Sequence, residues 1–193
     1  MKNISHFQWI NEPRAWEKTD FALSVTTDEE TDFWAQTWYG FKRFNGHFYG
    51  ADVAGDFTFQ VRVKAEFREL YDQAGIMLMA DESHWLKAGV EINDGAPAIG
   101  SVLTLEYSDW ATGLFPPDCK EFWMRLTRKG ECLRLQYSID GKIWPLLRLA
   151  HFPNLPKCAV GVMCCTPKRG GLSVQFDDFL LAPAFNHDLH DLS

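Results

Sequence analysis

The turn-forming residues of this chain recur at intervals that leave room for short strands and for little else. Gly, Asn and Asp tolerate the positive φ of tight turns, and they fall in clusters such as Asn93-Asp94-Gly95 and Asp140-Gly141. Between the clusters lie segments rich in Val, Ile, Phe, Trp and Tyr, the residues that favour strands. The expected strands are residues 21–27, 47–53, 57–65, 74–80, 85–92, 101–108, 121–127, 132–139, 143–149, 158–166 and 172–181.

The segment 57–65 shows the alternation of a strand that has one buried face and one wet face, with Phe or Val at every second position. No helical crossovers separate the strands. The best candidate helix, residues 65–71, spans one or two turns and is explained equally well as an irregular strand end. The sequence therefore predicts an all-β fold, a two-sheet antiparallel jelly-roll β-sandwich.

A length of 193 residues without a Pro-, Gly- or Ser-rich linker predicts a single domain over residues 1–193. Its core is expected over about residues 7–182, followed by a polar, frayed tail at 185–193. Hydrophobic residues make up 46% and aromatic residues 15% of the chain, which excludes a disordered protein.

The charge pattern bears on partners and on location. The net charge is −7 and the Lys and Arg residues are scattered singly, which argues against a nucleic-acid partner. The N-terminal ten residues lack an apolar core, and no apolar run approaches the ~20 residues that a bilayer requires, so neither export nor membrane insertion is expected. Five cysteines without CxxC spacing predict reduced thiols and a cytoplasmic protein.

The segment 85–92 carries the strongest indication of a site. Period-two alternation places Trp85, Lys87 and Glu91 on one face and apolar side chains on the other. An indole beside two opposite charges is an arrangement that holds polar ring compounds by stacking and charged hydrogen bonds. A solvated outer face with ordinary ion pairs is the alternative that the sequence leaves open.

Other segments add residues that would complete a groove. Trp123 and Arg125 repeat the pairing of one aromatic and one charge on 121–127, and residues 108–110 place Asp109 and Trp110 where a strand is expected to end at a sheet rim. Ser108-Asp109 is also a common turn opener. The expected ligand-binding residues are Gln73, Trp85, Lys87, Glu91, Asp109, Trp110 and Arg125. Trp34 and Tyr39 are expected either at the mouth of the same groove or packed under a loop.

Catalytic signals are weak. P-loops, dinucleotide fingerprints and GxSxG are absent, and the only carboxylate pairs for acid/base work join Glu91 to Asp109, Glu106 or Asp72. The acidic run at 28–32 is typical of a solvated loop, and the His-rich tail has no fixed frame for a metal ion. We expect no cofactor and no metal.

An ordered series of segments resembles the DUF1349 family (regulation-of-enolase-like) of the concanavalin A-like lectin/glucanase superfamily. The segments are Phe33-Trp34, Tyr71-Asp72-Gln73-Ala74-Gly75, Trp85-Leu86-Lys87-Ala88-Gly89-Val90-Glu91, Ser108-Asp109-Trp110, Tyr137-Ser138-Ile139-Asp140-Gly141-Lys142-Ile143-Trp144, Val160-Gly161-Val162-Met163 and Val174-Gln175-Phe176-Asp177-Asp178-Phe179. The resemblance implies a jelly roll whose concave sheet holds carbohydrate in relatives. Laminarinase-like members of the superfamily carry a Glu-x-Asp-x-x-Glu or Glu-x-Asp-x-Glu strand. Here Glu91-Ile92-Asn93-Asp94-Gly95 lacks the second acid in its place, which counts against retaining glycosidase chemistry.

The first hypothesis is therefore non-catalytic binding of a carbohydrate or a small sugar-derived metabolite in a concave-face groove. One alternative is a carbohydrate-active enzyme, a hydrolase, lyase or epimerase, that uses Glu91 and Asp109. The other is a regulatory protein that meets a metabolic enzyme through an exposed aromatic patch. The sequence leaves a protein partner or a homodimer open.

Overall fold

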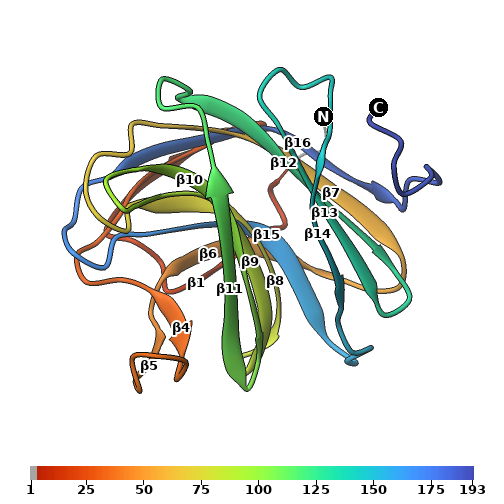
Figure 1. The fold of residues 1–193 in the computed structure, drawn as a ribbon, viewed down its shortest axis with the longest axis horizontal. Coiled ribbons are helices and arrows are strands. Elements are labelled where there is room, and N and C mark those ends of the chain that lie inside the picture. The colour runs from red at the N-terminus through yellow and green to blue at the C-terminus, as the bar shows by residue number, and fades with distance from the viewer. Residues whose placement is uncertain (1–3) are drawn as a thin grey trace.

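The computed structural model describes residues 4–193 and shows two seven-stranded antiparallel sheets packed face to face, with a small separate hairpin (Figure 1). We call the first the front sheet. In spatial order its strands are β1 (Gln8–Ile10), β6 (His47–Val53), β15 (Cys158–Cys165), β8 (Gln73–Asp81), β9 (His84–Asn93), β10 (Ala96–Leu105) and β11 (Tyr107–Leu114). The all-β, two-sheet prediction is confirmed.

The second sheet, which we call the back sheet, begins and ends on short strands. In spatial order its strands are β14 (Leu146–His151), β13 (Cys132–Ser138), β12 (Glu121–Lys129), β7 (Phe57–Ala65), β16 (Ser173–Pro183), β3 (Leu23–Thr26) and β2 (Ala15–Lys18). The separate hairpin joins β4 (Phe33–Ala35) to β5 (Lys42–Phe44). Residues 4–193 include no helix that could cross a membrane.

The main core lies between the two sheets and follows from the alternation within each strand. Phe59, Val61 and Val63 of β7 are fully buried, and the front sheet contributes Leu86 and Val90 from β9. Each such side chain stabilises the fold by about 1.5–3 kcal/mol when it leaves water. The side chains at the other positions of β9 consequently project from the outer face of the front sheet.

A second apolar cluster covers part of that outer face. The hairpin β4–β5 lies against it, with the Phe33 ring 6.1 Å from that of Trp85 and the Ala35 amide donating to Ser108 Oγ at 2.9 Å. The buried members of this cluster are Phe33, Trp34, Phe48, Met77, Met79, Trp85, Val102, Met163 and Cys165. The front sheet is therefore buried on both faces where the hairpin stands and open beside it.

The strand boundaries differ from the predicted ones where local signals are weak. The expected strand 101–108 is the end of one strand and the start of another, because the chain reverses at Glu106, whose φ is 69°. No Gly, Asn or Asp marks that turn, so the sequence did not reveal it. Because the turn precedes Tyr107, residues 108–110 lie inside β11 rather than at a strand end. The segment 65–71 is the irregular strand end, since β7 stops at Ala65 and no helix follows in this segment.

The prediction of a frayed tail is wrong. Residues 185–193 lie along the outer face of the back sheet, where the Trp144 amide donates to the Leu192 carbonyl at 2.9 Å. The Arg125 guanidinium donates to the Ser193 carbonyl at 2.8 Å and stacks on the Trp144 ring at 3.6 Å. The polar and aromatic groups of this face give the tail partners that its own sequence does not reveal.

Candidate functional site

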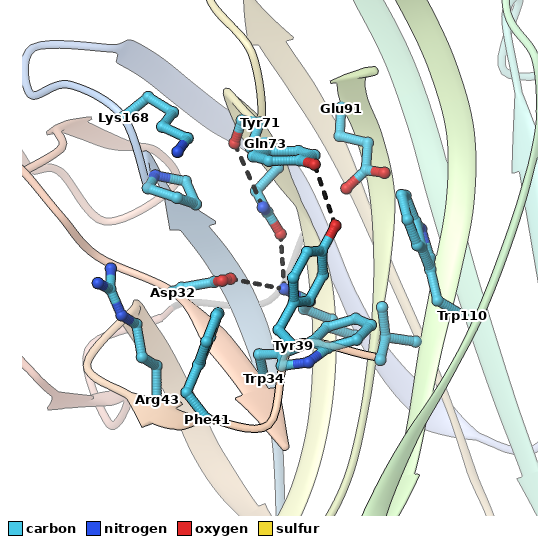
Figure 2. A pocket seen from close by; sticks show the side chains of 13 residues that line it. Asp32, Trp34, Tyr39, Phe41, Arg43, Tyr71, Gln73, Glu91, Trp110 and Lys168 are labelled. Atoms are coloured by element: carbon cyan, nitrogen blue, oxygen red, sulfur yellow. Dashed lines mark hydrogen bonds and ion pairs between the residues drawn. The ribbon is translucent and has the colours of Figure 1, made fainter. Parts of the chain in front are cut away.

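A hollow opens on the outer face of the front sheet beside the hairpin β4–β5 (Figure 2). Its volume is about 190 Å³. Pockets for drug-sized ligands occupy roughly 300–1,000 Å³, so this one suits a single small ring. The lining residues are Asp32, Trp34, Tyr39, Phe41, Arg43, Tyr71, Gln73, Lys87, Glu91, Val102, Trp110, Pro167 and Lys168.

The floor of the hollow is built by strand register. Gln73 of β8 pairs with Glu91 of β9, and Lys87 of β9 pairs with Val102 of β10. Between these rows Gly89 pairs with Gly75 on one side and with Gly100 on the other. A row of three glycines across adjacent strands leaves the floor free of side chains between Lys87 and Glu91.

Lys87 is the most deeply placed charge of the site. Its side chain is 5% exposed, and its ammonium donates to Asp32 Oδ1 at 3.1 Å and to Gln73 Oε1 at 2.7 Å. Burial by itself lowers the pKa of Lys87, but the Asp32 carboxylate and the other acidic groups nearby, Glu91 among them, together outweigh it, and the pKa lies above its ordinary value. Lys87 is therefore a fixed cation whose charge is neutralised by Asp32.

Glu91 lies on the same strand face and behaves differently. Burial raises the pKa of its carboxyl, despite the opposing effects of Lys87, Trp110 and the Asn93 amide, which donates to Glu91 Oε1 at 3.1 Å. The neutral form, which can donate a hydrogen bond as well as accept one, is thus favoured relative to an exposed glutamate.

This shift predicts a pH-dependent effect of Glu91→Gln. Glu91 ionises less readily in the folded chain, so its contribution to stability falls as pH rises from its ordinary value of 4.5 through the raised pKa. Glutamine keeps the oxygen that Asn93 contacts but never ionises. In urea denaturation, we expect the free energy of unfolding to change equally with pH in variant and wild type below pH 4.5. Above pH 4.5, we expect the variant to become more stable than the wild type by a margin that grows with pH. The exposed Glu17→Gln is the control, and an advantage that is constant with pH would contradict the assignment.

Aromatic rings form the walls of the hollow. The Trp34 and Trp110 rings meet edge to face at 6.2 Å, and the Tyr39 ring stacks on Phe41 at 5.6 Å. The hydroxyls of Tyr39 and Tyr71 lie 3.2 Å apart and join the hairpin to the start of β8, as Figure 2 shows. The walls therefore offer flat apolar surfaces with hydroxyls at their edge.

The segment that carries Tyr39 is held in an unusual backbone conformation. Gln36 and Trp38 have φ of 63° and 64°, a region that residues with side chains adopt rarely. The Thr37 amide bonds the Ala35 carbonyl at 2.7 Å and the Tyr39 amide bonds the Thr37 carbonyl at 2.7 Å, so two successive three-residue turns occur. Such strained turns concentrate at functional sites.

Four of the seven sequence-predicted residues line the hollow: Gln73, Lys87, Glu91 and Trp110. Trp85 shares their strand face but is fully buried beneath the hairpin, where its indole donates to the Glu82 carbonyl at 3.3 Å. The expectation that Trp85 stacks on a ligand is therefore corrected. The alternation along the strand predicts the face on which Trp85 lies. It carries no information about the hairpin that covers that face.

Asp109 and Arg125 lie away from the hollow. Asp109 is inside β11 on the face opposite Trp110, where it is 69% exposed and bonded to Arg148 at 3.0 Å. Arg125 belongs to β12 of the back sheet and is covered by the C-terminal tail. Placing both in a shared groove assumed that 108–110 ends a strand and that β9 and β12 share a sheet, and neither assumption holds.

The nominated acid/base pairs lose their geometric basis with these placements. Asp109 faces the other way, and Glu106 is 68% exposed at the turn between β10 and β11, near His84. Asp72 is fully buried, accepts a bidentate contact from Arg169 and caps the backbone amides of residues 68 and 69. None of the three lines the hollow with Glu91.

Several lining residues escaped the sequence analysis. Asp32 was expected in a solvated acidic loop, yet it is the partner of Lys87 because the hairpin brings it over the front sheet. Arg43, Lys168 and Tyr71 come from loops or short strands that show no periodicity. The aromatic cluster at 33–41 was the one available signal, and its Trp34 and Tyr39 do line the hollow.

Sequence comparison assigns the chain to a family. Residues 9–184 match the model of a family described as "Protein of unknown function (DUF1349)". The chain belongs to the DUF1349 family. It is 47% identical over 190 residues to Regulation of enolase protein 1 of Saccharomyces cerevisiae, which covers 98% of this chain and 96% of that protein. The resemblance drawn from the sequence is confirmed.

Solved structures agree with the fold of this DUF1349 protein. A functionally unknown protein from Saccharomyces cerevisiae superposes with a TM-score of 0.92 at 46% identity, covering 95% of this chain and 100% of that one. The carbohydrate-binding module CBM66 from Bacillus subtilis gives 0.61 at 13% identity, with coverage of 94% and 98%. The GH43 protein BlXynB from Bacillus licheniformis gives 0.72 at 14% identity, with coverage of 92% and 37%. The last two likenesses show the jelly-roll fold alone.

Proposed function

We propose that the hollow binds a carbohydrate or a small sugar-derived metabolite without catalysing a reaction. The observation that carries this proposal is the meeting of buried polar groups and aromatic walls in one ring-sized cavity: Lys87, Gln73 and Glu91 on the floor, Trp34 and Trp110 at the side. Sugars present apolar C–H faces that pack on aromatic rings and hydroxyls that bond to charged or amide groups.

Two further observations support the proposal. The CBM66 neighbour is by its name a carbohydrate-binding module, and it shares the fold. Glu91 has none of the nominated carboxylates beside it in the lining, and the other lining carboxylate, Asp32, is engaged by Lys87. Because acid/base chemistry on a glycoside needs two free carboxyl groups, binding is favoured over hydrolysis.

Trp110→Ala tests the stacking wall. We expect binding of whichever sugar stabilises the wild type in a thermal-shift panel to weaken about two- to tenfold, since one lost stacking contact costs about 0.5–1.5 kcal/mol. Isothermal titration would measure the affinity. Trp123→Ala is the matched control, because Trp123 lies on the back sheet with its indole bonded to Asp178 at 3.1 Å. Equal losses in both variants would exclude the hollow as the binding site.

A second candidate function is the binding of a metabolic enzyme through the hairpin. Trp38 at its tip is 93% exposed, and Tyr39 and Phe41 beside it are also exposed. Exposed aromatic clusters mark interaction sites, and the yeast relative is named for regulation of enolase.

Trp38→Ser tests this candidate. In titrations with purified enolase as the probe, we expect binding by the wild type and a loss of tenfold or more in the variant, because an exposed indole is a typical interface anchor. Tyr107→Ser, which removes another exposed aromatic ring on β11, serves as the control. Wild-type chain that fails to bind enolase would remove this candidate.

A further inference from the structure

The charges that line the hollow do not cancel. Three cationic side chains, Arg43, Lys87 and Lys168, stand against two carboxylates, Asp32 and Glu91. Lys87 and Asp32 neutralise each other through their 3.1 Å ion pair. What remains is two cations and Glu91, whose pKa is raised by burial.

Within residues 4–193, neither Arg43 nor Lys168 has a carboxylate oxygen within 4.0 Å. Arg43 donates to the Glu30 carbonyl at 3.4 Å and lies 5.5 Å from the Phe41 ring centre. The next residue along the chain, Arg169, is by contrast held by Asp72. Two unpaired cations at one cavity of a chain whose net charge is −7 make a local positive field that favours an anion.

The two cations lie on one side of the hollow. Figure 2 shows Lys168 and Arg43 on the side opposite Glu91 and Trp110. Arg43 is held by β5, and Lys168 by the loop that follows β15. A ligand that spans the hollow would therefore meet positive charge at one end and hydrogen-bonding groups with an indole at the other.

Resting on the proposed function, we infer that the ligand is an acidic sugar derivative, a single polyol unit that carries a carboxylate or a phosphate. The anionic group lies against Arg43 and Lys168, since a guanidinium fork matches the oxygen geometry of either anion. The hydroxyls bond to Gln73 and Glu91, and the carbon skeleton packs on Trp110.

Matched pairs of neutral and acidic sugars test this inference on the full chain by isothermal titration. The probes are glucose with glucuronate and glucose 6-phosphate, and ribose with ribose 5-phosphate. We expect at least one acid to bind ten times or more tightly than its neutral partner, with an affinity that weakens as salt is added. The carboxylate and phosphate members distinguish the two sources of charge.

The double variant Arg43→Gln/Lys168→Gln should bring the affinity for the acid down to that for its neutral partner. Lys42→Gln/Lys157→Gln removes the same charge from exposed positions outside the lining, and it should leave the preference intact.

The outcomes separate the inference from the proposed function. Equal affinity for neutral and acidic members overturns the inference and leaves carbohydrate binding standing. Absence of binding by every sugar, neutral or acidic, overturns both. Inorganic phosphate or acetate that binds as tightly as the sugar acids overturns the inference as well, because charge alone would then account for binding.

Discussion

Replacing Lys87 with methionine is expected to lower the free energy of unfolding by about 3–5 kcal/mol, the usual cost of removing one partner of a buried ion pair. The Asp32 side chain is 13% exposed, so its carboxylate would lose its counter-charge while it stays largely out of water. Gln73 Oε1 would lose its 2.7 Å donor as well. Urea denaturation at pH 7 measures the loss.

Asp32→Asn in the Lys87→Met background should restore most of this stability, because no uncompensated charge then remains. The double-mutant cycle isolates the pair. Arg148→Met is the matched control: its partner Asp109 is 69% exposed, and such surface pairs contribute about 0–1 kcal/mol. Losses that simply add in the double variant would show that Lys87 and Asp32 act independently.

Gly89→Ala is expected to destabilise the chain by about 3 kcal/mol or more, at the upper end of what overpacking costs. A Cβ at Gly89 would lie 2.0 Å from the Ala74 carbonyl oxygen and 2.8 Å from the Gly75 Cα. These are backbone atoms of the central strand β8, which cannot move aside without opening the ladder between β8 and β9.

In a thermal melt, 3 kcal/mol corresponds to roughly 6–12 °C for a chain of this size. Gly113→Ala on the edge strand β11 is the control, since a Cβ there would meet nothing within 4 Å. We expect the control to shift the melting temperature little. If Gly89→Ala had the same melting temperature as the control, the strands β8 and β9 would separate easily and the glycine row would not fix the floor of the hollow.

The face of a strand on which each residue lies could be predicted from the sequence, because side chains alternate between the two faces with a period of two. Alternation along β9 was enough to place Lys87 and Glu91 on one face and Leu86 and Val90 in the core. It was also enough, with Gly and Asp turns, to predict two antiparallel sheets. The short strands β1 and β4 escaped, since three residues carry too little periodicity to be recognised.

Which strands become neighbours is a property of the folded chain. Nothing within residues 121–127 tells whether Arg125 joins the sheet of Lys87 or the opposite one, because that choice is made by pairing with β7, about sixty residues earlier. The turn at Glu106, which sets the face of Asp109, bears no turn-forming residue.

The sequence by itself therefore determined the fold class and the side of each strand on which a residue stands, because both follow from backbone geometry between near neighbours. Only the tertiary structure decided that Asp32 reaches Lys87 from a separate hairpin, that Trp85 is covered, and that the tail docks on the back sheet. These contacts join segments far apart in the chain, and long-range packing, not local pattern, selects them.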